Sequence, residues 1–229
     1  YTEDLQGLPV VNIRYVPLSN TFNAFVKRCM DVVGSIVCII LFSPVMLLSA
    51  ILVKATSKGP LIFAQERVGL HNKPFQMYKF RTMYVQTEEE EQKGWTKKND
   101  PRVTGVGKFL RKTSLDEFPQ LFNVLKGDMS LVGPRPERPE IAAEYEKELS
   151  EFSLRLQVKA GLTGYAQVYG KYNTTPYDKL QMDLMYIAHP SLIEDLKIML
   201  ATVKILFMPE STEGVAEGAT TAMNNENLK

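Results

Sequence analysis

The segment Val32–Val53 constrains the fold of this chain more than any other feature, because it holds 22 residues without one charged side chain. A helix of this length rises about 1.5 Å per residue and is just long enough to cross the hydrocarbon core of a bilayer. The segment also lacks the polar face that a surface helix of a soluble domain would show. We therefore expect it to enter a membrane.

The middle and the flanks of this segment argue against a straight membrane crossing. Ser43 and Pro44 lie near its centre, where proline removes a backbone hydrogen bond and bends a helix. Asp31 immediately precedes the segment. Basic residues flank both ends, namely Lys27, Arg28, Lys54 and Lys58. Because basic flanks favour the cytoplasmic side, the pattern predicts a re-entrant helix–break–helix hairpin over about residues 24–54. A straight transmembrane helix and a buried core helix of a soluble protein are the alternatives.

Two adjacent carboxylates, Asp116 and Glu117, are the main candidates for chemistry. They lie in the run RKTSLDEFPQLFNVLKGDMSLVGPRPER, among five basic residues. A purely structural interpretation is that Ser114 and Glu117 form a capping box at a helix start. Pro119 would then occupy the fifth position of that helix, where its ring and its missing N–H disrupt the hydrogen bonding. A chemical role therefore competes with the capping role.

The composition of this run suits phosphate chemistry. A carboxylate can attack phosphorus when basic groups or a metal ion neutralise the phosphate charge. Asp116 is then the candidate nucleophile and Glu117 the candidate proton-handling or orienting group, since adjacent like charges raise each other's pKa. A diphosphate substrate commonly brings Mg²⁺, for which Asp116 is a suitable ligand. The basic side chains that would clamp phosphate oxygens are Arg111, Lys112, Arg135 and Arg138.

Composition narrows the class of protein. A chain of 229 residues suits one compact domain with a membrane element, and a net charge of +1 argues against nucleic acid as a partner. The two cysteines, Cys29 and Cys38, lie at or within the apolar segment and are interpreted as small hydrophobic residues, not as a disulfide or metal framework. Because the sequence begins at Tyr1 and not at methionine, we expect it to be a fragment of a longer protein.

Outside the apolar segment, the pattern predicts an α+β fold. The sequences LIFAQERVG and PFQMYKFRTM are typical of two strands joined at Leu70–Lys73. No strand followed by G-x-G-x-x-G opens a helix, which argues against a Rossmann-type nucleotide fold. Helices are expected on both sides of the carboxylates within Lys108–Lys126, and over Glu137–Glu151, Pro176–Ala188 and Ser191–Phe207.

The domain organisation follows from the composition of the two ends of the chain, of which the first is mixed and contains Gly7, Pro9 and Pro17. Residues 1–20 are expected to be a linker and residues 21–208 the functional domain. The polar stretch Glu88–Asp100 is interpreted as a solvated helix end and loop. Residues 209–229 are expected to be a disordered tail because they are polar, acidic and contain glycine.

Several ordered motifs resemble those of the bacterial sugar transferases. The match spans about residues 22–207, and its consistent spacing makes it far more specific than SLDE alone. The family comprises the monotopic phosphoglycosyl transferases that begin capsule, exopolysaccharide and O-antigen assembly. The matching segments are FVKRCMD, the Ser43–Pro44 step, QERVG, YKFRTM, TSLDEFPQLFNVLKGDMSLVGPRPERP, GLTGYAQV, DLMYI and SLIEDLKIML.

The resemblance implies transfer of a sugar phosphate from a UDP-sugar to undecaprenyl phosphate, with release of UMP, on the cytoplasmic face of the bacterial inner membrane. It assigns Asp116 as the nucleophile that attacks the β-phosphate, and Glu117 as a group that deprotonates or orients undecaprenyl phosphate. It also implies Mg²⁺ as the cofactor and a monotopic fold with surface amphipathic helices. Arg111 and Arg135 match family arginines near the phosphate, and weaker matches are Lys79, Arg81, Arg138 and Asp183.

One departure and several open points accompany the resemblance. Ala160 stands where the family usually has proline, which is expected to loosen a turn without touching the carboxylate pair. Longer members carry transmembrane helices and a further domain upstream, so residues 1–20 resemble their linker, and homo-oligomerisation of the intact protein stays open. The alternative functions are a non-catalytic membrane scaffold for polysaccharide assembly and hydrolysis of a lipid diphosphate. The transferred sugar is not decided by these residues.

Overall fold

The computed structural model describes residues 2–5, 8–11, 16–85, 100–170 and 175–206 of the chain. The predicted tail at residues 209–229 and most of the predicted loop at Glu88–Asp100 lie outside these residues, and the predicted linker at residues 1–20 lies partly outside them. In the described part of that linker, β1 (Thr2–Leu5) and β2 (Leu8–Val11) pair antiparallel. The assigned domain limits stay predictions.

The strands confirm the expected two-stranded unit. β3 (Ile62–Val68) and β4 (Pro74–Phe80) pair antiparallel, and the 3₁₀ turn η2 (Leu70–Asn72) joins them where the sequence predicted a connection. A further pair, β5 (Met129–Val132) and β6 (Ala160–Thr163), is parallel. With helices around these small sheets, the α+β class is confirmed.

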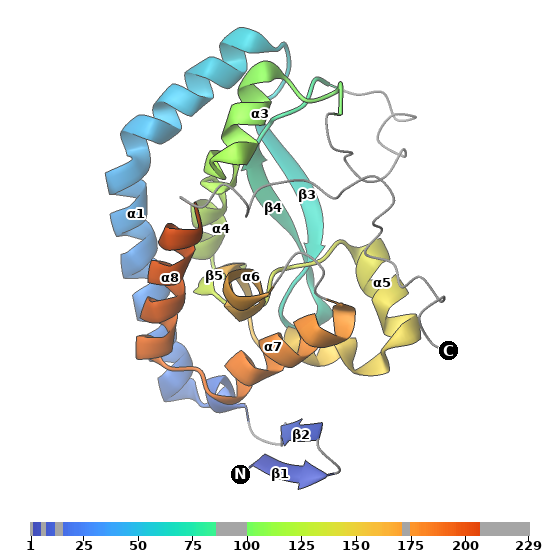
Figure 1. Ribbon diagram of the computed structural model, residues 1–229. Helices are drawn as coiled ribbons and strands as arrows, with labels where there is room; N and C mark the ends of the chain where they lie inside the picture. Colours follow the sequence, from blue (N-terminus) through green and yellow to red (C-terminus); the bar gives the residue numbers. More distant parts are fainter. Residues whose placement is uncertain (1, 6–7, 12–15, 86–99, 171–174, 207–229) are drawn as a thin grey trace.

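Helices lie around the β3–β4 and β5–β6 pairs (Figure 1). α3 (Gly105–Lys112) and α4 (Gln120–Lys126) lie on either side of the carboxylate pair, which itself falls in the 3₁₀ turn η3 (Leu115–Glu117). β5 lies in the main core, where its Met129 is buried together with Val124 and Ile198. The other short helices are η1 (Pro17–Ser19), α5 (Pro139–Glu148), η4 (Ser150–Gln157), α6 (Tyr165–Tyr169), α7 (Pro176–Ala188) and α8 (Leu192–Leu206).

The apolar segment forms one long helix, α1 (Thr21–Thr56), which curves along one side of the molecule (Figure 1). Pro44 lies inside this helix, and the expected break at Ser43–Pro44 is not present. Next to the proline, Ser43 Oγ donates a hydrogen bond to Ile40 O at 2.9 Å, which gives that carbonyl a partner. The helix–break–helix form is thus corrected to a continuous helix. A re-entrant path through a bilayer stays a prediction.

Both ends of α1 are fastened to the same globular fold. Near its start, Lys27 Nζ donates to Asp195 Oδ2 of α8 at 2.6 Å, and Asp31 Oδ1 accepts from Leu131 N of β5 at 3.0 Å. Just beyond its end, the carbonyl of Lys58 accepts from Arg81 Nη1 at 2.7 Å. Asp31, which looked misplaced before a membrane helix, is therefore buried against the fold and partnered there.

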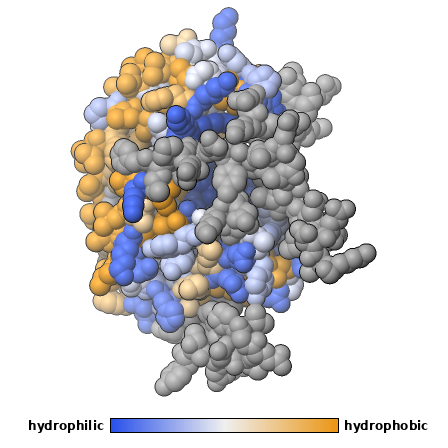
Figure 2. All heavy atoms as spheres, in the orientation of Figure 1, coloured by the Kyte–Doolittle hydropathy of each residue, from blue (hydrophilic) through white to orange (hydrophobic). Residues whose placement is uncertain are grey.

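The opposite side of α1 is exposed and apolar, and Figure 2 shows hydrophobic atoms gathered along the edge where α1 lies. Of the described helices, α1 is the one long and apolar enough to cross a membrane, and 11% of its most apolar window is buried. The buried-core-helix alternative therefore does not hold. The exposed residues of this apolar face are Phe22, Phe25, Val33, Ile36, Val37, Ile40, Leu41, Val45, Leu47, Leu48, Ile51 and Leu52, and α8 adds Leu192, Ile193, Leu196, Leu200 and Val203.

Candidate active site

Asp116 and Glu117 lie in a tight turn that starts at Ser114. After α3 ends, Ser114 adopts the left-handed conformation, with a φ of 55°, which is uncommon for a residue with a side chain. The side chain of Ser114 makes no capping hydrogen bond, so the capping-box interpretation is wrong. Pro119 stands at the N-cap of α4, where the helix requires no N–H from it. The pair is thus held by a separate turn between two helices.

Glu117 is held by basic side chains from two distant parts of the chain. Lys79 Nζ, on β4, donates to Glu117 Oε1 at 2.8 Å. Arg135 Nη1 donates to Glu117 Oε2 at 3.2 Å, and Arg135 Nη2 donates to Oε1. Burial alone would raise the pKa of Glu117, but the charges of Arg135 and Lys79 outweigh it and hold that pKa well below its usual range. The structure thus brings two predicted basic residues, Lys79 and Arg135, to the ionised carboxylate of Glu117.

Asp116 lies beside this ion-pair cluster without joining it. The residue is 8% exposed, and within the described part of the chain no basic side chain forms an ion pair with its carboxylate. Burial raises the pKa of Asp116 to about 6, with Lys79 opposing and Glu117 supporting that increase. At neutral pH, Asp116 is therefore an ionised carboxylate with little solvation, which suits a nucleophile.

Arg111 adds a positive charge on the α3 side of Asp116. Its Nε donates to Thr82 Oγ1 at 2.8 Å, just after β4. Thr82 is itself buried, and its carbonyl accepts from Thr104 N at 3.0 Å. Burial lowers the pKa of Arg111, whereas the charge of Asp116 raises it. The anchored guanidinium is thus within the electrostatic reach of Asp116, as a phosphate-binding role requires.

The other predicted basic residues have different positions. Arg81 is buried, and its guanidinium donates to the carbonyls of Lys58 and Ser57, so it fastens the end of α1 instead of facing the carboxylate pair. Lys112 is exposed at the end of α3. Arg138 is the N-cap residue of α5. A direct phosphate contact is therefore better supported for Arg111 and Arg135 than for these three residues.

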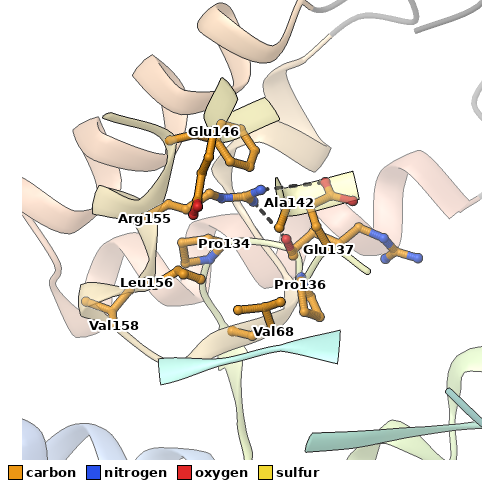
Figure 3. A pocket seen from close by; sticks show the side chains of 12 residues that line it. Val68, Pro134, Pro136, Glu137, Ala142, Glu146, Arg155, Leu156 and Val158 are labelled. Atoms are coloured by element: carbon orange, nitrogen blue, oxygen red, sulfur yellow. Dashed lines mark hydrogen bonds and ion pairs between the residues drawn. The ribbon is translucent and has the colours of Figure 1, made fainter. Parts of the chain in front are cut away.

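Asp183 belongs to a second charged cluster, which supports the backbone at Arg135. Arg155 Nη2 donates to Arg135 O at 2.7 Å and lies 2.7 Å from Asp183 Oδ2. Glu137 forms an ion pair with Lys179 and lies 3.6 Å from Arg155 Nη1. Figure 3 shows Arg155 reaching towards Glu137 beside a small crevice. Burial raises the pKa of Asp183, and Arg155 opposes that increase. Asp183 is thus connected to Glu117 indirectly, because Asp183 contacts Arg155, Arg155 contacts the backbone of Arg135, and Arg135 contacts Glu117.

Residues 22–209, most of the length of the chain, match the sequence model of a family described as bacterial sugar transferase. This chain belongs to the bacterial sugar transferase family. The match covers both carboxylates and each basic residue described above.

Relatives of this chain carry names that differ in the sugar. The UDP-glucose:undecaprenyl-phosphate glucose-1-phosphate transferase of Klebsiella pneumoniae is 46% identical over 207 residues, which cover 88% of this chain and 44% of that protein. The undecaprenyl-phosphate galactose phosphotransferase of Salmonella typhimurium is 42% identical, covering 82% of this chain and 42% of that protein. A glucose-1-phosphate transferase of Caulobacter vibrioides is 43% identical, covering 81% and 71%. The chain thus spans less than half of the first two relatives.

Four charged residues near the candidate site were not predicted from the sequence, namely Arg67, Glu137, Arg155 and Lys179. Arg67 Nη1 donates to Pro136 O at 3.1 Å, and burial lowers the pKa of Arg67 to about 10. Arg67 stands in QERVG and Glu137 in GPRPER, so the motifs already quoted carried a signal for both. Arg155 and Lys179 have no such local signal, because tertiary packing alone brings them to Glu137.

Proposed function

We propose that this chain transfers a sugar 1-phosphate from a UDP-sugar to undecaprenyl phosphate and releases UMP, as the names of its relatives indicate for those proteins. The observation that carries the proposal is the contrast between two neighbouring carboxylates. Asp116 is buried without an ion-pair partner among the described residues, whereas Glu117 is fixed between Lys79 and Arg135. The Asp116 carboxylate is therefore available as a nucleophile. The Glu117 carboxylate holds the two basic side chains, Lys79 and Arg135, in place beside it.

In the first step, an Asp116 carboxylate oxygen attacks the β-phosphorus of the UDP-sugar. A P–O bond forms to Asp116, the bond from the β-phosphorus to the bridging oxygen breaks, and UMP leaves with that oxygen. The product is a phosphosugar–aspartyl enzyme. Arg111 and Arg135 stabilise the charge on the phosphate oxygens, because guanidinium groups match phosphate geometry and need little rearrangement when already anchored.

In the second step, a phosphate oxygen of undecaprenyl phosphate attacks the same phosphorus. The bond to Asp116 breaks, the carboxylate is regenerated, and the polyprenyl diphosphate sugar leaves. The depressed pKa of Glu117 keeps it ionised, and both of its oxygens already accept hydrogen bonds. Glu117 therefore orients Lys79 and Arg135 and does not carry a proton. A phosphate monoester is already largely ionised near neutral pH and needs no strong base.

Mg²⁺ is the proposed cofactor, and Asp116 is the residue that would hold it. In the described residues, there is no group of three or more His, Cys, Asp and Glu side chains that would form a metal cage. The arrangement fits a Mg²⁺ shared with the substrate, because this ion is often held by one or two carboxylates together with substrate phosphates. When bound, Mg²⁺ would neutralise charge on the diphosphate.

The proposed location is the cytoplasmic surface of the bacterial inner membrane, with α1 entering one leaflet and returning. Two observations support it. Both ends of α1 are bound to one globular fold. A straight crossing would instead place the two ends of the helix on opposite sides of the membrane. The ring of Phe118, next to Glu117, packs on Phe42 of α1 with a centroid distance of 5.0 Å. The carboxylate pair thus lies against the apolar helix, where a lipid phosphate and a soluble nucleotide sugar can meet.

The experiment that tests this function uses the full chain in lipid nanodiscs with Mg²⁺ and a UDP-sugar. Without undecaprenyl phosphate, intact-mass spectrometry should detect a sugar-phosphate adduct and one equivalent of UMP. Asp116→Asn should abolish both signals, whereas Glu144→Gln, which removes an exposed carboxylate on α5, should keep them. An adduct that forms normally in the Asp116→Asn variant would remove Asp116 from its role.

The transferred sugar can be identified by UMP release across a panel of UDP-sugars in the presence of undecaprenyl phosphate. Glucose, galactose and N-acetylgalactosamine come first, because they occur in the names of the relatives. Release of UMP should be matched by a lipid-linked sugar. UMP without that lipid product would favour hydrolysis, and no UMP from any UDP-sugar would favour the scaffold alternative.

A further inference from the structure

A cavity of about 120 Å³ lies at the end of α4 opposite the carboxylate pair. Glu117 lies shortly before the N-terminus of α4, whereas Gly127 caps the C-terminus of that helix. A Cβ atom added to Gly127 would lie 3.7 Å from Lys159 Nζ, one of the lining groups. Seven helical residues span about 10 Å, so the cavity is separate from the candidate active site. Its charged and polar lining includes Lys27, Arg28, Asp31, Gln157, Lys159 and Tyr186.

The charged residues of this lining are unequally partnered. Lys27 forms ion pairs with Asp195 and Asp31. Arg28 donates to the carbonyls of Val124 at 2.5 Å and Leu125 at 2.6 Å, which uses two of its five N–H donors. Lys159 is half-buried and has no ion-pair or hydrogen-bond partner for its ammonium group among the described residues. The cavity therefore has more positive than negative charge.

We propose that this cavity binds a phosphate ester, with Lys159 and Arg28 as its main ligands. A phosphate oxygen would give the Lys159 ammonium group the partner that the described fold does not supply. Burial and nearby Arg28 lower the pKa of Lys159, while the charges of Asp31 and Asp128 oppose that decrease. A bound anion would further favour the charged form of Lys159. The volume is about four times the share of one liquid water, which is enough for a phosphate group.

The phosphate ester has two candidate sources that share this chemistry. A phospholipid headgroup is one, because Phe22 and Phe25 lie on the first turns of α1, near Ala24 and Lys27 of the lining, and are 72% and 64% exposed. Aromatic side chains beside basic residues are typical of a bilayer surface. A soluble phosphate ester is the other source. Neither source depends on the proposed transfer reaction.

The test uses the full chain and two probes. The lipid probe is phosphatidylglycerol mixed into phosphatidylcholine nanodiscs, and its retention is measured by native mass spectrometry. The soluble probe is glycerol 3-phosphate, which is followed by calorimetry with the chain in maltoside micelles instead of nanodiscs, because phosphatidylcholine itself carries a phosphate ester. Lys159→Gln removes the cation, Lys159→Arg keeps it, and Lys147→Gln on α5 removes an exposed cation elsewhere.

Lys159→Gln is expected to weaken binding of the responding probe about tenfold, since it removes one charge-assisted hydrogen bond. Lys159→Arg and Lys147→Gln should bind like the unaltered chain. Without either probe, Lys159→Gln should unfold at no lower temperature, because an unpartnered half-buried cation does not stabilise the fold. Retention of phosphatidylglycerol alone identifies the lipid source, and binding of glycerol phosphate identifies the soluble one. The proposal would be overturned if neither probe binds. It would also be overturned if Lys159→Gln binds the probe as tightly as the unaltered chain does.

Discussion

Asp116 and Glu117 are neighbours in the chain, yet their carboxylates have opposite electrostatic environments. Burial without an ion-pair partner in the described part of the chain raises the pKa of Asp116 to about 6. The hydrogen bonds and charges of Arg135 and Lys79 hold the pKa of Glu117 well below its usual range. The turn at Ser114 and the N-cap at Pro119 give two adjacent residues these different directions. Different roles for the two acids follow from this contrast.

The rate of adduct formation should depend on pH through Asp116. A protonated carboxylic acid is a poor nucleophile, so the rate should fall about tenfold for each pH unit below about 6 and should level off above it. The measurement is single-turnover UMP release without undecaprenyl phosphate, because the acceptor phosphate titrates in the same range. A rate that stays constant from neutral pH down to the ordinary pKa of aspartic acid would contradict the role of Asp116.

Asp116→Asn should stabilise the protein at neutral pH while it abolishes activity. The pKa of Asp116 is higher in the folded protein than its ordinary value of 3.8, so the folded state binds the proton more tightly. The contribution of Asp116 to stability therefore falls as pH rises from about 4 to about 6. Asparagine avoids this loss, which amounts to about 3 kcal/mol at most.

Denaturant unfolding of both proteins in the same detergent, as a function of pH, measures this effect. The free energy of unfolding should be similar for the two proteins below about pH 4 and should favour Asp116→Asn above about pH 6. Glu144→Gln is the matched control, since its exposed carboxylate should give no comparable change. A variant that is less stable than the unaltered chain at neutral pH would show that Asp116 contributes a structural contact.

The sequence predicted those parts of the fold that depend on local pattern. The alternating β-favouring residues on both sides of Leu70–Lys73 are enough to define β3 and β4. The motifs around Asp116 identified the candidate nucleophile, and the same stretch supplied Arg135. The strand prediction succeeded because neighbouring residues determine a hairpin. The roles assigned to Asp116 and Arg135 stay predictions, which a motif suggested.

The remaining features depend on contacts between distant residues. Pro44 normally interrupts a helix, but α1 packs along β5, α3 and α4, and that tertiary support keeps the helix continuous. Arg81 and Asp183 carry charges that suit a phosphate site, yet their partners are the carbonyl of Lys58 and the guanidinium of Arg155. No pattern within the sequence identifies such partners before the chain is folded.

The Arg155–Asp183 pair should act as a structural support for Arg135 and not as a substrate contact. Asp183→Leu leaves Arg155 buried without this partner and should cost about 3–5 kcal/mol of stability. The double variant Arg155→Met with Asp183→Leu should lose less stability than the sum of the single changes, because no charge is left uncompensated. Equilibrium unfolding of the unaltered chain, Arg155→Met, Asp183→Leu and the double variant measures this coupling.

Steady-state kinetics of the same variants separates the two roles of Asp183. Loss of the hydrogen bond from Arg155 Nη2 to Arg135 O should mainly lower kcat, since Arg135 would be less well placed for the transition state. A direct substrate contact predicts instead a higher KM for Asp183→Leu with unchanged stability. That result would restore Asp183 to the phosphate-binding group.

Both ends of α1 should be reachable from the cytoplasmic side of the membrane. The ends are bound to one fold by the Lys27–Asp195 and Arg81–Lys58 contacts, so a path that enters and leaves the same leaflet preserves both contacts. Ser19 and Lys58 are exposed on the two flanks and can each be replaced by cysteine in a chain that carries Cys29→Ser and Cys38→Ser. A membrane-impermeant maleimide should label both positions in inverted vesicles and neither in intact spheroplasts. Labelling of one flank from each side would establish a straight crossing, and it would require at least one of the two contacts to break.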